Sequence, residues 1–189
     1  MELTLDNDII VASETVELLG LTIDQHLSFK QHIEKTVKKC HGIIGVIKKA
    51  RMVLPLQLLK LSYMALVRPH LEYCNLAFAN SSKTNLAKLE VVQKIASRII
   101  CGEKRDAHSD PLLKRLELLS LKERRDKKII TAVKNILCNN CHPYLSNMFE
   151  EGSDGLISNN IASRTTFGKK RFSYYAKEAY NNLLMDIPD

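Results

Sequence analysis

Two cysteines and a histidine near residue 140 form the sequence pattern with the most specific chemical meaning. Two residues separate Cys138 from Cys141, and His142 follows directly, which is the C-x-x-C-H spacing of c-type haem attachment. Haem attachment requires export, and the N-terminus carries no secretory signal pattern. The two thiols could also begin a zinc site, but no second ligand pair stands at the usual spacing. We interpret the pattern as a coincidence at the end of a helix, and we expect no metal site and no cofactor in this chain.

Carboxylates are the residues that metal-dependent phosphoryl transfer requires, because they must hold two ions about 4 Å apart. The chain contains no adjacent pair of aspartates. No Ser/His/Asp or Cys/His combination stands in a recognisable catalytic context either. The acids of the first segment are scattered over turns and strands: Glu2, Asp6, Asp8, Glu14, Glu17 and Asp24. We therefore predict no catalytic residues and no enzyme activity for the chain by itself.

Basic side chains are the remaining residues with a chemical meaning. The formal net charge is +7, and lysine and arginine gain free energy when they displace counterions from phosphates. One group of basic residues has acidic residues among it and therefore carries less net charge; it comprises Arg124, Arg125, Lys127 and Lys128. The densest group lies between residues 35 and 51 and comprises Lys35, Lys38, Lys39, Lys48, Lys49 and Arg51. This group predicts contact with a nucleic-acid backbone, and its alternative interpretation is a solvated lysine face.

An amphipathic helix is predicted to carry this basic group. Apolar residues recur at spacings of four and three, and at about 100° per residue they share one face. Ser28 followed by Gln31 has the pattern of a capping box, which predicts that the helix begins near residue 29. The apolar face comprises Ile33, Val37, Cys40, Ile44 and Ile47, and the opposite face Lys35, Lys38, Lys39 and Lys49.

Several further helices are predicted from capping residues and prolines. A helix is expected from Pro55 to Pro69, another from Thr84 to Gly102, a third that begins at Ser109-Asp110-Pro111, and a fourth from the Ser120 and Glu123 capping box to Asn139-Asn140.

The two ends of the chain differ from the helical middle. Alternating apolar residues predict strands at 3–5, 9–11 and 18–23. The polar, Gly/Ser/Asn-rich segment 150–163 predicts a loop, and a short aromatic segment covers 172–184. The fold class is therefore mainly α: a short N-terminal antiparallel β-element, a helical bundle and a loosely ordered C-terminal tail. We divide the chain into residues 1–27, 28–149 and 150–189.

Five segments, in this order, resemble the end of the palm, the thumb and the connection of LINE-type (non-LTR) retrotransposon reverse transcriptases. The resemblance covers nearly the whole chain. The family usually has Trp at two positions that hold Phe78 and Tyr180 here, and these aromatic rings are expected to keep the packing role. The segments are Leu19-Gly20-Leu21-Thr22-Ile23-Asp24 with Leu27-Ser28-Phe29 and His32-Ile33, Arg68-Pro69-His70-Leu71-Glu72-Tyr73, residues 89–100, His108-Ser109-Asp110-Pro111-Leu112, and Arg171-Phe172-Ser173-Tyr174 with Asn181 and Leu183.

The resemblance implies a fragment of an RNA-directed DNA polymerase of a mobile element. Residues 1–27 would be the palm end with a primer-grip-like β-element, and 28–149 the thumb and connection. The basic helix would hold an RNA or DNA template–primer duplex, weakly and without sequence preference. Gly20 would lie in the primer grip, where the missing Cβ lets a backbone approach closely. The full-length family uses Mg²⁺ on an Asp pair that precedes the matched region, so a longer chain would supply the palm and fingers.

Two other function classes stay open at this point. One is a helical protein-interaction module without nucleic-acid binding, and the other is a small haem or zinc protein built on Cys138, Cys141 and His142. No stretch approaches the length of a membrane span, so we expect no membrane partner and a location in the nucleus or cytoplasm. The five cysteines are predicted to be reduced and mostly buried.

Overall fold

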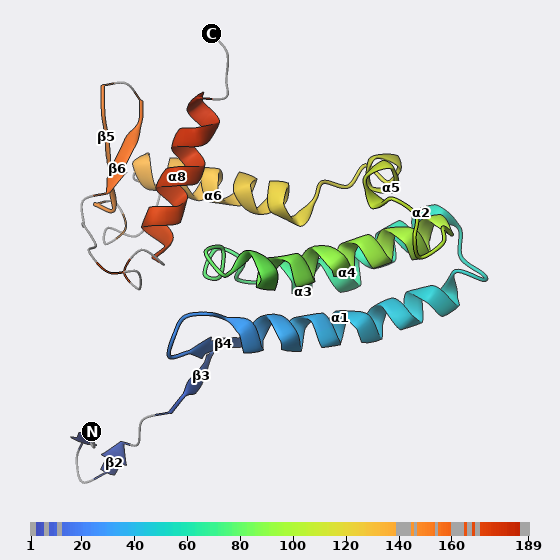
Figure 1. The fold of residues 1–189 in the computed structure, drawn as a ribbon, viewed down its shortest axis with the longest axis horizontal. Helices are drawn as coiled ribbons and strands as arrows, with labels where there is room; N and C mark the ends of the chain where they lie inside the picture. The colour runs from blue at the N-terminus through green and yellow to red at the C-terminus, as the bar shows by residue number, and fades with distance from the viewer. Residues whose placement is uncertain are drawn as a thin grey trace.

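The structure is a computed structural model, and the chain is mainly helical with short antiparallel β-elements at its N-terminus (Figure 1). The structure describes residues 3–5, 8–10, 13–138, 145, 147–153, 155–159, 165, 168 and 171–185. The three longest helices are α1 (Lys30–Ala50), α4 (Lys83–Cys101) and α6 (Leu121–Leu137). The shorter helical elements are α2 (Leu56–Ser62), η1 (Tyr63–Val67), α3 (Arg68–Glu72), α5 (Ser109–Arg115) and α8 (Phe172–Met185).

Helix α1 buries the face that its spacing predicts. Cys40 and Ile33 are fully buried, and Val37 packs against the same core. The predicted capping box is wrong, because α1 begins after Phe29, which has a φ of 55° and offers no side-chain cap. The Asp24 carboxylate instead organises the preceding turn and accepts the Phe29 N–H. Ser28 donates its hydroxyl to this carboxylate, so it belongs to the turn.

The helix that starts at Pro55 does not end at Pro69, which corrects the sequence-based boundary. Pro69 lies in the first turn of α3, where its missing N–H is not needed. The π-helical turn η1 precedes it and lets the chain continue in a helical path to Glu72. The physical reason is that the wider turn removes the demand for a hydrogen bond from the proline nitrogen.

The capping predictions for α4, α5 and α6 have mixed outcomes. The capping box of Ser120 and Glu123 is confirmed in both directions, and Gly102 ends α4 with a φ of 80°. Ser82 caps α4, so the prediction of Thr84 is wrong. Helix α5 begins at Ser109 as predicted, but its N-cap is His108 and no side chain caps it.

The N-terminal β-element consists of two hairpins. Strand β1 (Leu3–Leu5) pairs with β2 (Asp8–Ile10), and β3 (Thr15–Leu18) pairs with β4 (Leu21–Asp24), both antiparallel. A single strand over 18–23 is therefore wrong, because Leu19 and Gly20 form the turn between β3 and β4. Their φ angles of 48° and 78° match a two-residue hairpin turn that favours glycine.

The apolar core has two parts. One lies between α1, α2, η1, α3 and α4, and Phe78 is buried in it. The other joins α6 with α8 and with the hairpin of β5 (Phe149–Glu151) and β6 (Ile157–Asn159), and it contains Tyr180. The composition of 150–163 predicts a loop, but buried Phe149 and Ile157 anchor strands here, and Gly155 turns between them with a φ of 75°.

The cysteines are less buried than predicted. Cys40 is buried, and burial raises the pKa of its thiol to about 11. Cys101 is half-buried, whereas Cys74 and Cys138 are exposed. The prediction of mostly buried thiols is therefore wrong for these two exposed cysteines.

Candidate nucleic-acid interface

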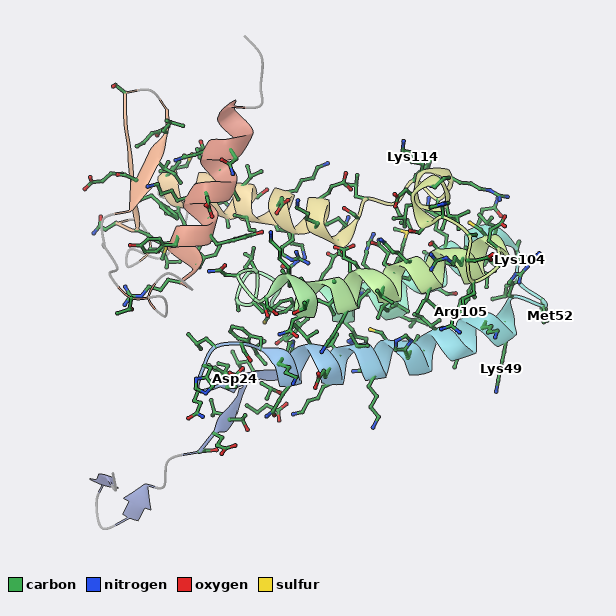
Figure 2. The ribbon with its side chains drawn as sticks, in the orientation of Figure 1. Asp24, Lys49, Met52, Lys104, Arg105 and Lys114 are labelled. Atoms are coloured by element: carbon green, nitrogen blue, oxygen red, sulfur yellow. The ribbon has the colours of Figure 1, made fainter. Side chains whose placement is uncertain are left out.

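The predicted basic face of α1 is exposed along its whole length. Asp24 lies just before the start of the helix and Lys49 at its far end (Figure 2). None of the six basic residues has a salt bridge to an acid anywhere in the described part of the chain. The exposed residues are Lys35, Lys38, Lys39, Lys48, Lys49 and Arg51. Their charge is therefore free to meet an anionic partner.

The second basic cluster is mostly used by the fold itself. Arg124 and Lys128 both form ion pairs with Glu72, which joins α6 to α3. Arg125 is 3% exposed, so it cannot meet a partner without rearrangement. Lys127 stays exposed. This cluster therefore offers much less free charge than the face of α1.

A polar pocket of about 430 Å³ lies at the N-terminal end of the basic face. It brings Gly20 from the β3–β4 turn together with two of the predicted lysines, Lys35 and Lys39. Tyr73 also lines it, and the Tyr73 hydroxyl donates a hydrogen bond to the Leu19 carbonyl. We call it the Tyr73 pocket, and it is lined by Glu17, Gly20, Thr22, His32, Lys35, Thr36, Lys39, His70 and Tyr73.

Two hydrogen bonds order one wall of the Tyr73 pocket. Lys35 Nζ donates to Thr22 Oγ1 at 3.1 Å, which holds the ammonium group near the strand. The Thr22 backbone N–H donates to His32 Nδ1 at 3.4 Å, so the neutral ring carries its proton on Nε2. His32 itself is buried and lies against Phe78, with a ring-centroid distance of 5.6 Å.

Both histidines of this pocket favour the neutral form. Burial lowers the pKa of His32, and the charge of Lys35 lowers it further, while Glu17 acts in the opposite direction. Burial and the charge of Lys39 lower the pKa of His70. The structure thus places each histidine beside a lysine whose charge opposes protonation of the ring.

The other end of α1 meets the C-terminal end of α4. A second pocket, of about 350 Å³, joins Lys48 and Arg51 to Arg98 and Arg105, with Glu103 as its acid. Arg51 packs so closely over Gly102 that a Cβ there would lie 2.1 Å from Nη2. Lys49, Met52, Lys104, Arg105 and Lys114 lie at this same end of the bundle (Figure 2).

The structure thus divides the predicted site residues between two ends of one helix. Gly20, Lys35 and Lys39 meet in one pocket, and Lys48 and Arg51 meet in the other, while Lys38 and Lys49 line neither. The sequence interpretation missed His32, His70, Tyr73, Arg98 and Arg105. His32 lies on α1 itself, whereas only tertiary packing brings the other four to α1. His32, His70, Tyr73 and Arg98 all lie within the segments that carry the resemblance, but their residue types were not taken there as site residues.

The C-x-x-C-H pattern cannot be placed in full, because Cys141 and His142 lie outside the described residues. Over the part of the chain that the structure describes, no three His, Cys, Asp or Glu side chains gather as a metal site would require. Within those same residues, no helix is both long and apolar enough to span a membrane. In comparisons with known proteins, no family model, no curated protein and no solved structure matches this chain.

Proposed function

We propose that this chain is a non-catalytic nucleic-acid-binding module that holds the phosphate backbone of an RNA or DNA duplex along α1. The resemblance to the thumb of LINE-type reverse transcriptases supports the proposal and suggests a template–primer duplex as the partner. A fragment of an RNA-directed DNA polymerase would contribute binding in this way without contributing metal-ion chemistry.

The observation that carries the proposal is the unpaired charge of α1. Each of its lysines is exposed, and none of them forms a salt bridge with an acid in the described residues. Counterions must therefore collect along this face, and a phosphate backbone gains free energy by releasing them. Side chains on one exposed helix face can meet successive phosphates but read no base edges, which predicts binding without sequence preference.

The test is a salt titration of duplex affinity with the four lysines Lys35, Lys38, Lys39 and Lys49 changed to glutamine. Glutamine keeps the helix propensity, so stability should hardly change. We expect affinity to fall equally for every duplex sequence. The slope of log affinity against log salt should become shallower by about 0.9 for each lost phosphate contact.

A charge-matched control removes four exposed lysines of α4 and α6: Lys83, Lys122, Lys127 and Lys134. This variant has the same net charge but keeps the face of α1, so it should retain most of the affinity and the slope. If the α1 variant and the parent chain give the same titration, the lysines are a solvated face. The helical protein-interaction module would then be the better proposal.

A further inference from the structure

The Tyr73 pocket combines features that the open surface of the basic face does not have. Its lining comes from β3, β4, α1 and α3, and it is concave, whereas Lys38 and Lys49 stand on open surface. One wall is ordered in advance by the Lys35 to Thr22 hydrogen bond. Such a site can hold one anionic group at a defined position, which a band of mobile lysines cannot do.

We propose that the Tyr73 pocket is a discrete oxyanion site that holds one phosphate group of a nucleic-acid strand. This inference rests on the proposed function and adds a fixed anchoring point to it. The donors are the ammonium groups of Lys35 and Lys39 and the Nε2–H of His32, because its Nδ1 accepts the Thr22 N–H. Among the lining residues, the single opposing group is the Glu17 carboxylate.

The charge balance favours an anion at every relevant pH. Two lysines against one glutamate leave the pocket with one positive charge while His32 and His70 are neutral. Protonation of His70 raises this to two positive charges, whereas protonation of His32 would remove the Nδ1 acceptor of the Thr22 N–H. A bound dianion offsets the lysine charge that opposes protonation of His70, so it favours uptake of a proton by this ring. By linkage, the affinity for the anion must rise as the pH falls through the titration range of His70.

Gly20 and Tyr73 both line the pocket. Gly20 turns the chain with a φ of 78°, and a Cβ there would come within 3.9 Å of Tyr73 Cε1. The Tyr73 hydroxyl donates its proton to the Leu19 carbonyl. This hydrogen bond ties the β3–β4 turn to the end of α3, and the hydroxyl therefore has no proton left to donate to a bound anion. Tyr73 is therefore a positioning residue that keeps the hairpin over the lysines.

The probe for the test is sulfate, a dianion of the same shape as phosphate that does not titrate in the working range. Sulfate is added to the full chain at constant ionic strength, and the ring signals of His32 and His70 are followed by NMR between pH 5.5 and 7.5. We expect saturable shifts of both rings and a higher pKa for His70 in saturating sulfate. Uptake of one proton should tighten sulfate binding on the order of fivefold over this range.

Matched variants separate the pocket from general screening. Lys35→Gln and Lys39→Gln should weaken sulfate binding severalfold, whereas Lys38→Gln and Lys49→Gln remove the same charge from the same helix and should leave it unchanged. His70→Gln is preferred to a change at His32, whose buried ring packs on Phe78. It should reduce the pH dependence while binding at pH 7.5 persists.

The source of the phosphate is distinguished with single-stranded oligonucleotides that carry either a 5′-phosphate or a 5′-hydroxyl. Better displacement of sulfate by the phosphorylated strand identifies a terminal phosphate, and equal displacement identifies a backbone phosphate. The proposal is overturned if neither strand displaces sulfate, if neither ring shifts saturably, or if the control lysines matter as much as Lys35 and Lys39. If the unmodified chain binds duplex but not sulfate, the pocket alone is rejected. If it binds sulfate in the pocket but no duplex, the duplex-binding role of α1 is rejected.

Discussion

The backbone N–H of Phe29 donates to Asp24 Oδ2 at 2.7 Å, immediately before the first turn of α1. The same carboxylate accepts the Ser28 N–H at 3.1 Å, the Ser28 hydroxyl at 3.0 Å and the His26 N–H at 3.1 Å. One side chain therefore holds the whole turn between β4 and α1. Because Phe29 adopts a φ of 55°, which L residues rarely do, this turn needs such support. It sets the position of the lysine face relative to Gly20.

Asp24→Asn should destabilise the chain by about 1–3 kcal/mol, because an amide replaces an ionised acceptor of four hydrogen bonds. Burial works to raise the pKa of Asp24, but the hydrogen bonds from Ser28, Phe29 and His26 together hold it below its ordinary value. The stabilisation should therefore be fully present above about pH 4 and be lost as the pH falls through the lowered pKa. Urea unfolding of parent and variant between pH 2.5 and 7 measures this difference. Asp106→Asn, at an exposed site, is the control and should show no comparable loss.

Glu72 joins α3 to α6, and its removal should weaken that junction. Arg124 donates to it through Nε and Nη2, and Lys128 Nζ lies 3.0 Å from Oε2. Burial alone would raise the pKa of Glu72, but these cations lower it below its usual range. Glu72→Gln should cost about 1–3 kcal/mol, because it leaves the partly buried Arg124 and Arg68 and the more exposed Lys128 without their anion. The contribution is present above about pH 4.5 and disappears as the pH falls through the lowered pKa.

Thermal unfolding at pH 7 and at pH 3 checks the Glu72 prediction. The exposed pair of Glu34 and Lys88 supplies the control, since both side chains are 39% exposed or more and such pairs contribute little. Glu34→Gln should hardly move the melting temperature. Equal effects of the two variants at pH 7 would show that Glu72 is an ordinary surface acid.

Tyr63 and Gln93 are buried polar neighbours that should respond oppositely to replacement. No group in the described residues offers the Tyr63 hydroxyl a hydrogen bond of good geometry. Gln93, in contrast, donates to the Leu119 carbonyl at 3.0 Å and accepts the Leu121 N–H at 3.2 Å. Tyr63→Phe should leave stability unchanged within about 1 kcal/mol or increase it, whereas Gln93→Leu should cost about 2 kcal/mol or more by orphaning both backbone groups. Chemical denaturation measures the free energy of unfolding of both variants. A large loss of stability in Tyr63→Phe would show that the Tyr63 hydroxyl does have a hydrogen-bond partner.

Several elements could be predicted from the sequence because interactions between neighbouring residues determine them. The buried face of α1 follows from apolar residues at spacings of three and four, and its lysines must then face solvent. The Ser120 and Glu123 box and the turn at Gly102 also involve only neighbouring residues, so their geometry depends on little else. These features determined that the chain is mainly helical and that α1 carries free positive charge.

Tertiary structure decided the rest, because the responsible contacts join residues far apart in the chain. Ser28 has a capping pattern, yet the carboxylate of Asp24 captures it for a turn. Pro69 would end an isolated helix, but η1 widens the preceding turn and the helical path continues. His70 and Tyr73 reach Lys35 and Lys39 only because α3 packs against α1. The spacing of residues predicts the faces of a single helix. A pocket, in contrast, forms where several elements meet, and only the packing of the core determines which elements those are.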